Sequence, residues 1–208
     1  MTDGVLAGVR VLELGQVLAG PFAGAILADL GADVVKVERI DGGDDARRMG
    51  LAFRHGDALN FQVFNRGKQS VVLNLKDPAD RDRARALVLD ADVLVENNRP
   101  GVMQRLGLGW DWFGPRKPGL IYCSISAYGQ SGPRSTEGGF DVTLQAMSGV
   151  MSVTGEPGGA PVKCGVPIAD FTAGVYGAFT IASLLARVRS GGAGGQVRGP
   201  GEVEAEER

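Results

Sequence analysis

The chain has 208 residues, of which 44% are hydrophobic and 22% are charged, and this composition is typical of a globular protein. Its net charge of -2 argues against general affinity for nucleic acid or anionic membranes, because such binding usually needs a concentrated basic surface. The two cysteines lack metal-type spacing, the N-terminus lacks the layout of a signal peptide, and no apolar run reaches the roughly 20 residues of a membrane-spanning helix. We therefore expect a cytoplasmic protein with no metal ion and no membrane association.

Strands and helices are predicted to alternate along the first part of the chain. Short apolar runs rich in Val, Leu and Ile predict strands at residues 9–14, 33–38, 70–75, 92–97 and 119–126. Helical spacing is found at residues 22–31, and Asp77 followed by Pro78 marks the N-cap and first residue of a helix over 77–91. A short helix is expected after Pro100. This alternation predicts a doubly wound α/β domain with a mostly parallel sheet.

The pattern changes in the second part of the chain. Residues 140–155 look helical in their first half, and residues 171–189 form a long apolar helical pattern that opens just after Asp170. Residues 189–208 are rich in glycine and then acidic, without apolar periodicity, so we expect them to be disordered. The predicted organisation is one α/β domain over residues 1–188 and a disordered tail over residues 189–208.

Ligands of doubly wound sheets bind at the loops that follow the strands. Those loops contain Gln16–Pro21, Arg39, Asn97–Gly101 and Tyr128–Gly132. Several cations flank the same strands, namely Arg39, Lys68, Lys76, Arg99 and Arg105. Gathered on one edge they would suit a phosphorylated ligand, although solvated loop charge gives the same pattern.

A dinucleotide site is a competing interpretation, because Glu38 closes the second strand where an acid can hold a ribose hydroxyl. The loop after the first strand argues against it, since Gly15, Gly20 and Pro21 do not make the G-x-G-x-x-G pattern. His55 is the only histidine, so histidine-based metal sites and most Ser-His-Asp schemes lack their partners. A nicotinamide or flavin enzyme is thus the weaker alternative.

Asp170 is a carboxylate alone in an apolar, glycine-punctuated run. An aspartate one residue before a helix is first of all an N-cap. Its neighbours Val166, Ile168 and Phe171 would desolvate the carboxylate, while nearby glycines leave room for a ligand. A carboxylate in such surroundings can act as a nucleophile through a covalent intermediate. The pattern alone leaves both roles open, and they are compatible.

Consecutive blocks of the sequence carry a family resemblance. They read VLELGQVLAGPFAGAILADLGADVVKVER, FNRGKQSVVLNLK, ADVLVENNRPGVMQRLGLGW, LIYCSISAYGQSGP, FDVTLQAMSGVMSVTG and VKCGVPIADFTAGVYGA. In this order they resemble the class III CoA-transferases, also called the CaiB/BaiF family, which includes formyl-CoA transferase. A match in several ordered blocks is far more specific than any single short motif.

The resemblance implies a Rossmann-like large domain, an interlocked homodimer, and transfer of CoA between an acyl-CoA thioester and a carboxylic acid without a permanently bound cofactor. It implies that Asp170 is the nucleophile, passing through an aspartyl-acyl anhydride and then an aspartyl-CoA thioester. The positions that it implies for CoA binding are Gln16, Val17, Arg39, Leu73, Lys76, Asn97, Asn98 and Arg105. We expect the small domain of the longer family members to be absent.

The chain also departs from the family pattern. Related racemases that epimerise 2-methylacyl-CoA use a histidine where this chain has Phe140, so a two-base proton exchange would lose one partner. Formyl-CoA transferase has a glutamine where this chain has Leu18, which leaves the exchanged acids open. The resemblance stops after Val197, which favours a truncated or frame-shifted product. A racemase and a non-catalytic, truncated CoA-binding fragment are therefore the alternatives to a CoA-transferase.

Overall fold

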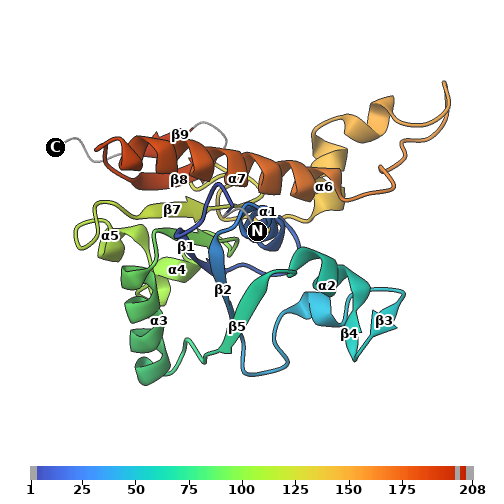
Figure 1. The fold of residues 1–208 in the computed structure, drawn as a ribbon. Helices are drawn as coiled ribbons and strands as arrows, with labels where there is room; N and C mark the ends of the chain where they lie inside the picture. Colours follow the sequence, from blue (N-terminus) through green and yellow to red (C-terminus); the bar gives the residue numbers. More distant parts are fainter. Residues whose placement is uncertain (1–3, 200–201, 205–208) are drawn as a thin grey trace.

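The computed structural model describes residues 4–199 and 202–204, and within them seven strands form one sheet (Figure 1). In sheet order they are β5 (Lys68–Val72), β2 (Asp33–Glu38), β1 (Arg10–Leu14), β6 (Val93–Glu96), β7 (Ile121–Ser124), β8 (Gly195–Gly199) and β9 (Glu202–Glu204). Neighbouring strands run parallel, except that β9 is antiparallel to β8. The strand order reverses between β1 and β6, which confirms the predicted doubly wound, Rossmann-like α/β sheet.

Helices cover both faces of this sheet (Figure 1). One face carries α1 (Ala19–Asp29) and α7 (Ile168–Arg189), and the other carries α3 (Pro78–Asp90), α4 (Val102–Arg105) and α5 (Trp110–Phe113). Side chains alternate along each strand, so that in β6 Val93 and Val95 join the core under α1 and α7 while Leu94 joins the other core. Because both faces are buried, the strands read as nearly continuous apolar runs.

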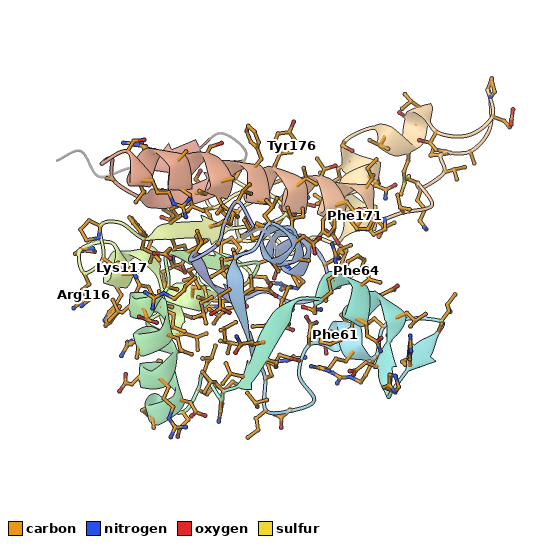
Figure 2. All side chains as sticks on the ribbon, in the orientation of Figure 1. Phe61, Phe64, Arg116, Lys117, Phe171 and Tyr176 are labelled. Carbon is orange, nitrogen blue, oxygen red and sulfur yellow. The ribbon has the colours of Figure 1, made fainter. Side chains whose placement is uncertain are left out.

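Small elements that the sequence pattern did not predict lie between β2 and β5. They are η1 (Asp45–Arg47), β3 (Phe53–Arg54), β4 (Asp57–Ala58) and α2 (Leu59–Phe64). The ring of Phe64 in α2 lies edge-on to Phe171 at the start of α7, with ring centroids 5.7 Å apart (Figure 2). Phe22 of α1 packs against both rings. This aromatic cluster joins α2 to the helix that carries Asp170.

The predicted strands are all found, but some bounds shift and the predicted tail needs correction. Residues 70–75 were expected in a strand that is observed as β5 over Lys68–Val72. The disorder predicted for residues 189–208 is wrong for Gly195–Gly199, which form β8 and pair in parallel with β7, and for Glu202–Glu204, which form β9. Backbone pairing, rather than an apolar pattern, orders this glycine-rich segment, and only Val197 adds to the core. Residues 200–201 and 205–208 of the predicted tail lie outside the described residues.

The helix α7 contradicts the expectation that no segment is long and apolar enough to cross a membrane. It has 22 residues and a mean hydropathy of 1.4 over its most apolar window. Its inner face, with Ala178, Ile181 and Leu185, is buried against α1 and the sheet. A helix that packs in a protein core passes the same test of length and hydropathy, and 33% of this window is buried in the structure.

Buried charges lie between the sheet and α1. Glu13 in β1 and Lys36 in β2 are register partners, and Lys36 Nζ is 2.7 Å from Glu13 Oε1. Lys68 Nζ is 2.7 Å from the other carboxylate oxygen, Oε2. All three side chains are at most 2% exposed. Gly24 of α1 lies directly over this carboxylate, and a Cβ there would overlap Glu13 Oε2.

We predict that Gly24→Ala destabilises the protein even though alanine is the better helix former by about 1 kcal/mol. The added methyl group must displace a carboxylate held by two lysines, and overpacking of this kind costs about 1–3 kcal/mol. Urea denaturation followed by circular dichroism measures the free energy of unfolding. Gly119→Ala is the control, because a Cβ at that position meets nothing within 4 Å. Equal stability of the two variants would contradict the prediction.

Candidate active site

The loops after β1 and β6 meet where the strand order reverses. Gln16 follows β1, and its backbone N–H donates to Asn97 Oδ1 at 2.7 Å. The Asn97 amide nitrogen donates in return to the Gln16 carbonyl oxygen at 2.9 Å. The next residue, Asn98, is held by its backbone N–H, which donates to the buried Glu96 carboxylate at 2.7 Å. Two loops far apart in sequence are thus fixed to each other at the crevice where such sheets bind ligands.

A cavity of about 650 Å³ opens beside this pair of loops. It is lined by five of the predicted site residues, namely Gln16, Val17, Asn97, Asn98 and Asp170. Its volume lies within the range of about 300–1,000 Å³ that is usual for small-molecule sites. The structure therefore brings the predicted nucleophile and the predicted loop residues to the wall of one cavity.

The interpretation of Asp170 as an N-cap is wrong. The helix α7 begins at Ile168, so that Asp170 lies within its first turn. The residue that caps the helix comes from α6 (Asp141–Met147), because Asp141 Oδ1 accepts from the N–H of Ala169 at 2.8 Å and of Asp170 at 3.4 Å. Asp170 is therefore free of the capping role, and it lines the cavity.

Two effects set the acidity of Asp170. Burial is the larger one, and the negative charge of Asp141 is the second; together they raise the pKa of Asp170 from 3.8 to about 6. The carboxylate is still ionised at neutral pH, but it is less well solvated than an ordinary surface aspartate. A poorly solvated carboxylate at a cavity wall is suited to nucleophilic attack.

Cations lie on the wall of the same cavity. Arg48 and Arg99 line it. Asp45 Oδ1 accepts from Arg48 at 2.9 Å and from Arg39 at 2.6 Å, so that it joins the two guanidinium groups. Arg39 thus lies next to the cavity without lining it. The sequence pattern does not reveal Asp45 and Arg48, because the short η1 turn that begins at Asp45 and ends before Arg48 has no apolar periodicity.

Besides Arg39, three more of the predicted CoA-binding residues do not line the cavity. Lys76 and Arg105 are exposed beyond the ends of β5 and β6, further along the same edge of the sheet. The side chain of Leu73 is in the core and 5% exposed, so only its backbone is available to a ligand. If they take part, they contact a ligand that extends out of the cavity along the strand ends.

The cavity also contains residues that sequence reasoning did not select as site residues. Gly138 packs against the Arg99 guanidinium, and a Cβ there would lie 2.7 Å from Arg99 Nη2. Phe140, the position of the missing histidine, lines the cavity and is 75% exposed. The acid after it, Asp141, caps α7. The sequence signal available for this segment was the pair Gly138 and Gly139, shortly before the acid Asp141 that begins α6.

A second, mostly apolar cavity of about 850 Å³ lies next to the first. It shares Ser126 and Ala127 with the polar cavity, and Ile168 and Thr172 of α7 line it. The first turn of α7 therefore separates a polar cavity from an apolar one. Among the described residues, no group of three or more His, Cys, Asp or Glu side chains is placed to hold a metal ion.

The match to a family model covers residues 6–200, and that model describes CoA-transferase family III. The chain belongs to this family. It is 46% identical over 193 residues to the succinate–glutarate CoA-transferase of Agrobacterium fabrum, a match that covers 89% of this chain and 48% of that protein. It is 45% identical to the acetyl-CoA:oxalate CoA-transferase of Acetobacter aceti over 190 residues, covering 90% of this chain and 49% of that enzyme.

A solved structure shows the same fold. The CaiB/BaiF family protein of Brucella suis superposes with a TM-score of 0.89 at 40% sequence identity, covering 94% of this chain and 53% of that one. The chain thus spans about half the length of the curated relatives that it matches.

We predict that Asp141→Asn lowers the pKa of Asp170 from about 6 toward its ordinary value of 3.8. Asparagine keeps an oxygen that accepts from the Ala169 N–H, so the cap stays, while the repulsive charge is lost. The shift is measured by carbon-detected NMR titration of the Asp170 carboxyl group. Because burial is the larger cause, the pKa remains above 3.8. An unchanged value would show that the charge of Asp141 does not reach Asp170.

Proposed function

We propose that this chain transfers CoA between an acyl-CoA thioester and a carboxylic acid, with Asp170 as the nucleophile. The observation that carries the proposal is the position of Asp170 at the wall of the cavity at the strand-order reversal, in a chain of CoA-transferase family III. Relatives named for CoA transfer to glutarate and to oxalate support the reaction type. They also favour small dicarboxylic acids as the exchanged acids.

The proposed reaction moves an acyl group and a thiolate without any change of oxidation state. A carboxylate oxygen of Asp170 attacks the thioester carbonyl carbon, the C–S bond breaks, and CoA leaves as a thiolate. The thiolate then attacks the Asp170 carbonyl carbon of the mixed anhydride, which releases the donor acid and forms an aspartyl-CoA thioester. The acceptor carboxylate repeats the two steps in reverse and restores Asp170.

The cations around the cavity support the proposed binding of CoA. Arg48 and Arg99 lie on the cavity wall, and Asp45 holds Arg39 next to Arg48. Guanidinium groups bind phosphate oxygens in a bidentate manner. The exposed Lys76 and Arg105 continue this cationic edge beyond the cavity. A long ligand with a thioester at one end and phosphates at the other fits this arrangement.

Two alternatives follow from particular features of the chain. The racemase interpretation has less support, because Phe140 lines the cavity where the second base would be needed. A fragment that binds CoA without turnover is favoured by the half-length match to the relatives. We infer a cytoplasmic homodimer as the working form of a transferase, and light scattering after size-exclusion chromatography measures its oligomeric state.

The nucleophile is tested by trapping. We predict that incubation with succinyl-CoA followed by hydroxylamine converts Asp170 to a hydroxamate, which peptide mass spectrometry detects. Asp170→Asn abolishes the modification, because an amide cannot form the anhydride. Asp141→Asn is the matched control, since it leaves the nucleophile in place. Transfer of CoA with Asp170 unmodified would refute the assignment, and CoA binding without turnover or modification would identify a non-catalytic fragment.

The pH dependence of trapping is a separate prediction. The carboxylate, not the carboxylic acid, attacks the thioester, so the rate rises with pH through a midpoint at about 6 and then levels off. The rate falls tenfold for each pH unit below that midpoint. Single-turnover trapping between pH 4.5 and 8 measures the profile. A midpoint near 4 would mean that burial does not raise the pKa of Asp170.

A further inference from the structure

The backbone of Val17 adopts a conformation that its side chain disfavours. Val17 has φ of +64°, in the left-handed region. A β-branched residue is rare there, because its side chain crowds the backbone. Such a conformation persists only where the surroundings impose it, and it is often found at functional sites. Val17 lies in the loop Gly15–Leu18, and Gln16, Val17 and Leu18 line the polar cavity together with Asp170.

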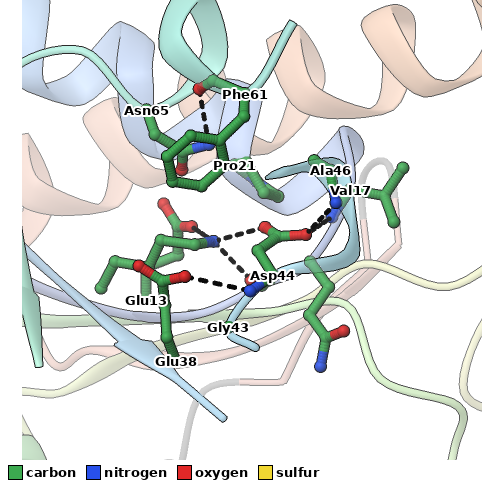
Figure 3. Close-up of polar contacts among 12 residues, drawn as sticks. Glu13, Val17, Pro21, Glu38, Gly43, Asp44, Ala46, Phe61 and Asn65 are labelled. Atoms are coloured by element: carbon green, nitrogen blue, oxygen red, sulfur yellow. Dashed lines mark hydrogen bonds and ion pairs between the residues drawn. The ribbon is translucent and has the colours of Figure 1, made fainter. Parts of the chain in front are cut away.

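Three consecutive residues of this loop are each held by a different side chain. Lys36 Nζ donates to the Gly15 carbonyl oxygen at 2.7 Å. The Asn97 side chain accepts from the Gln16 N–H and donates to the Gln16 carbonyl oxygen. Asp44 Oδ1 accepts from the Val17 N–H at 2.9 Å (Figure 3). The contact from Asp44 is the one that acts on the strained residue itself.

Asp44 and Lys36 belong to a buried network of four charges. Asp44 Oδ2 lies 2.9 Å from Lys36 Nζ, and both side chains are at most 2% exposed. Lys36 Nζ also contacts Glu13, and Glu13 contacts Lys68, so that two anions face two cations. Asp44 Oδ1 accepts a second bond, from the Ala46 N–H at 2.9 Å (Figure 3). Neither Asp44 nor Lys36 touches the cavity, so neither is placed to contact substrate.

We infer that Asp44, supported by Lys36, is a positioning residue that imposes the left-handed conformation of Val17 and so shapes the cavity that Asp170 also lines. The inference rests on the proposed function for the ligand, a CoA thioester. The buried charge matters because Lys36 orients the Asp44 carboxylate, whose other oxygen then points at the Val17 N–H. An uncharged side chain at position 44 loses this orientation and leaves Lys36 with one carboxylate fewer.

A double-mutant cycle tests the inference. Glycine adopts positive φ without strain, so a loop with Val17→Gly needs less support from Asp44. The variants are Asp44→Asn, Val17→Gly and the two combined. Val88→Ala, at a buried position of α3, is the control for a general loss of stability. The measurements are the Kd for CoA by calorimetry, the single-turnover rate of Asp170 trapping, and hydrogen exchange of the Gly15–Leu18 amides.

We expect Asp44→Asn to weaken CoA binding or slow trapping at least tenfold, and to speed exchange of the Val17 amide by a similar factor. In the Val17→Gly background the same substitution should cost threefold or less. Losses that are equal in both backgrounds, or no larger than those of Val88→Ala, would overturn the inference. A wild-type chain that neither binds CoA nor reacts would refute the proposed function, while the exchange rates would still decide whether Asp44 holds the loop.

Discussion

The ion pair between Lys36 and Glu13 constrains much of the architecture around the site. Burial alone would lower the pKa of Lys36, but Glu13 and Asp44 outweigh it and raise the pKa, so the lysine is charged. A buried ammonium group needs an oxygen for each of its three protons, and Lys36 has Glu13, Asp44 and the Gly15 carbonyl. Because these partners come from β1, from the segment after β2 and from the loop before α1, the charge fixes all three relative to one another.

This constraint explains why the loop before α1 is rigid without the glycine pattern of dinucleotide sites. A G-x-G-x-x-G loop exposes backbone amides for a pyrophosphate, whereas here the amides of Gln16 and Val17 are already used by Asn97 and Asp44. Pro21 in the first turn of α1 offers no N–H at all. Under the proposed function the charge of a ligand would then be met by side chains, and Arg48 and Arg99 line the cavity.

The sequence predicts most of the sheet and part of the site. Strands buried on both faces appear as apolar runs. The family blocks single out Asp170, Asn97 and Asn98, which line one cavity at the carboxyl ends of the strands. β8 was missed because its glycines carry no pattern and its order comes from pairing with β7. The cap of α7 was missed because Asp141 lies 28 residues before Ala169 and acts from another helix. The sequence shows Glu13 in the run VLEL and Lys36 in the run VVKVE. Only the register of β1 and β2, which places these two residues side by side, shows that they form an ion pair.

Asp170 lies in the helix turn that separates two unlike cavities, and the solvation of this turn sets the acidity of Asp170. Burial and the charge of Asp141 raise the pKa of Asp170 to about 6, and on the apolar side its neighbour Ile168 lines the second cavity. Any segment that covers the apolar cavity would remove water from this flank and raise the pKa of Asp170 above about 6. A carboxylate that is harder to ionise is also the stronger nucleophile once it is ionised. Covering the apolar cavity would therefore tune the acid that we propose as the nucleophile.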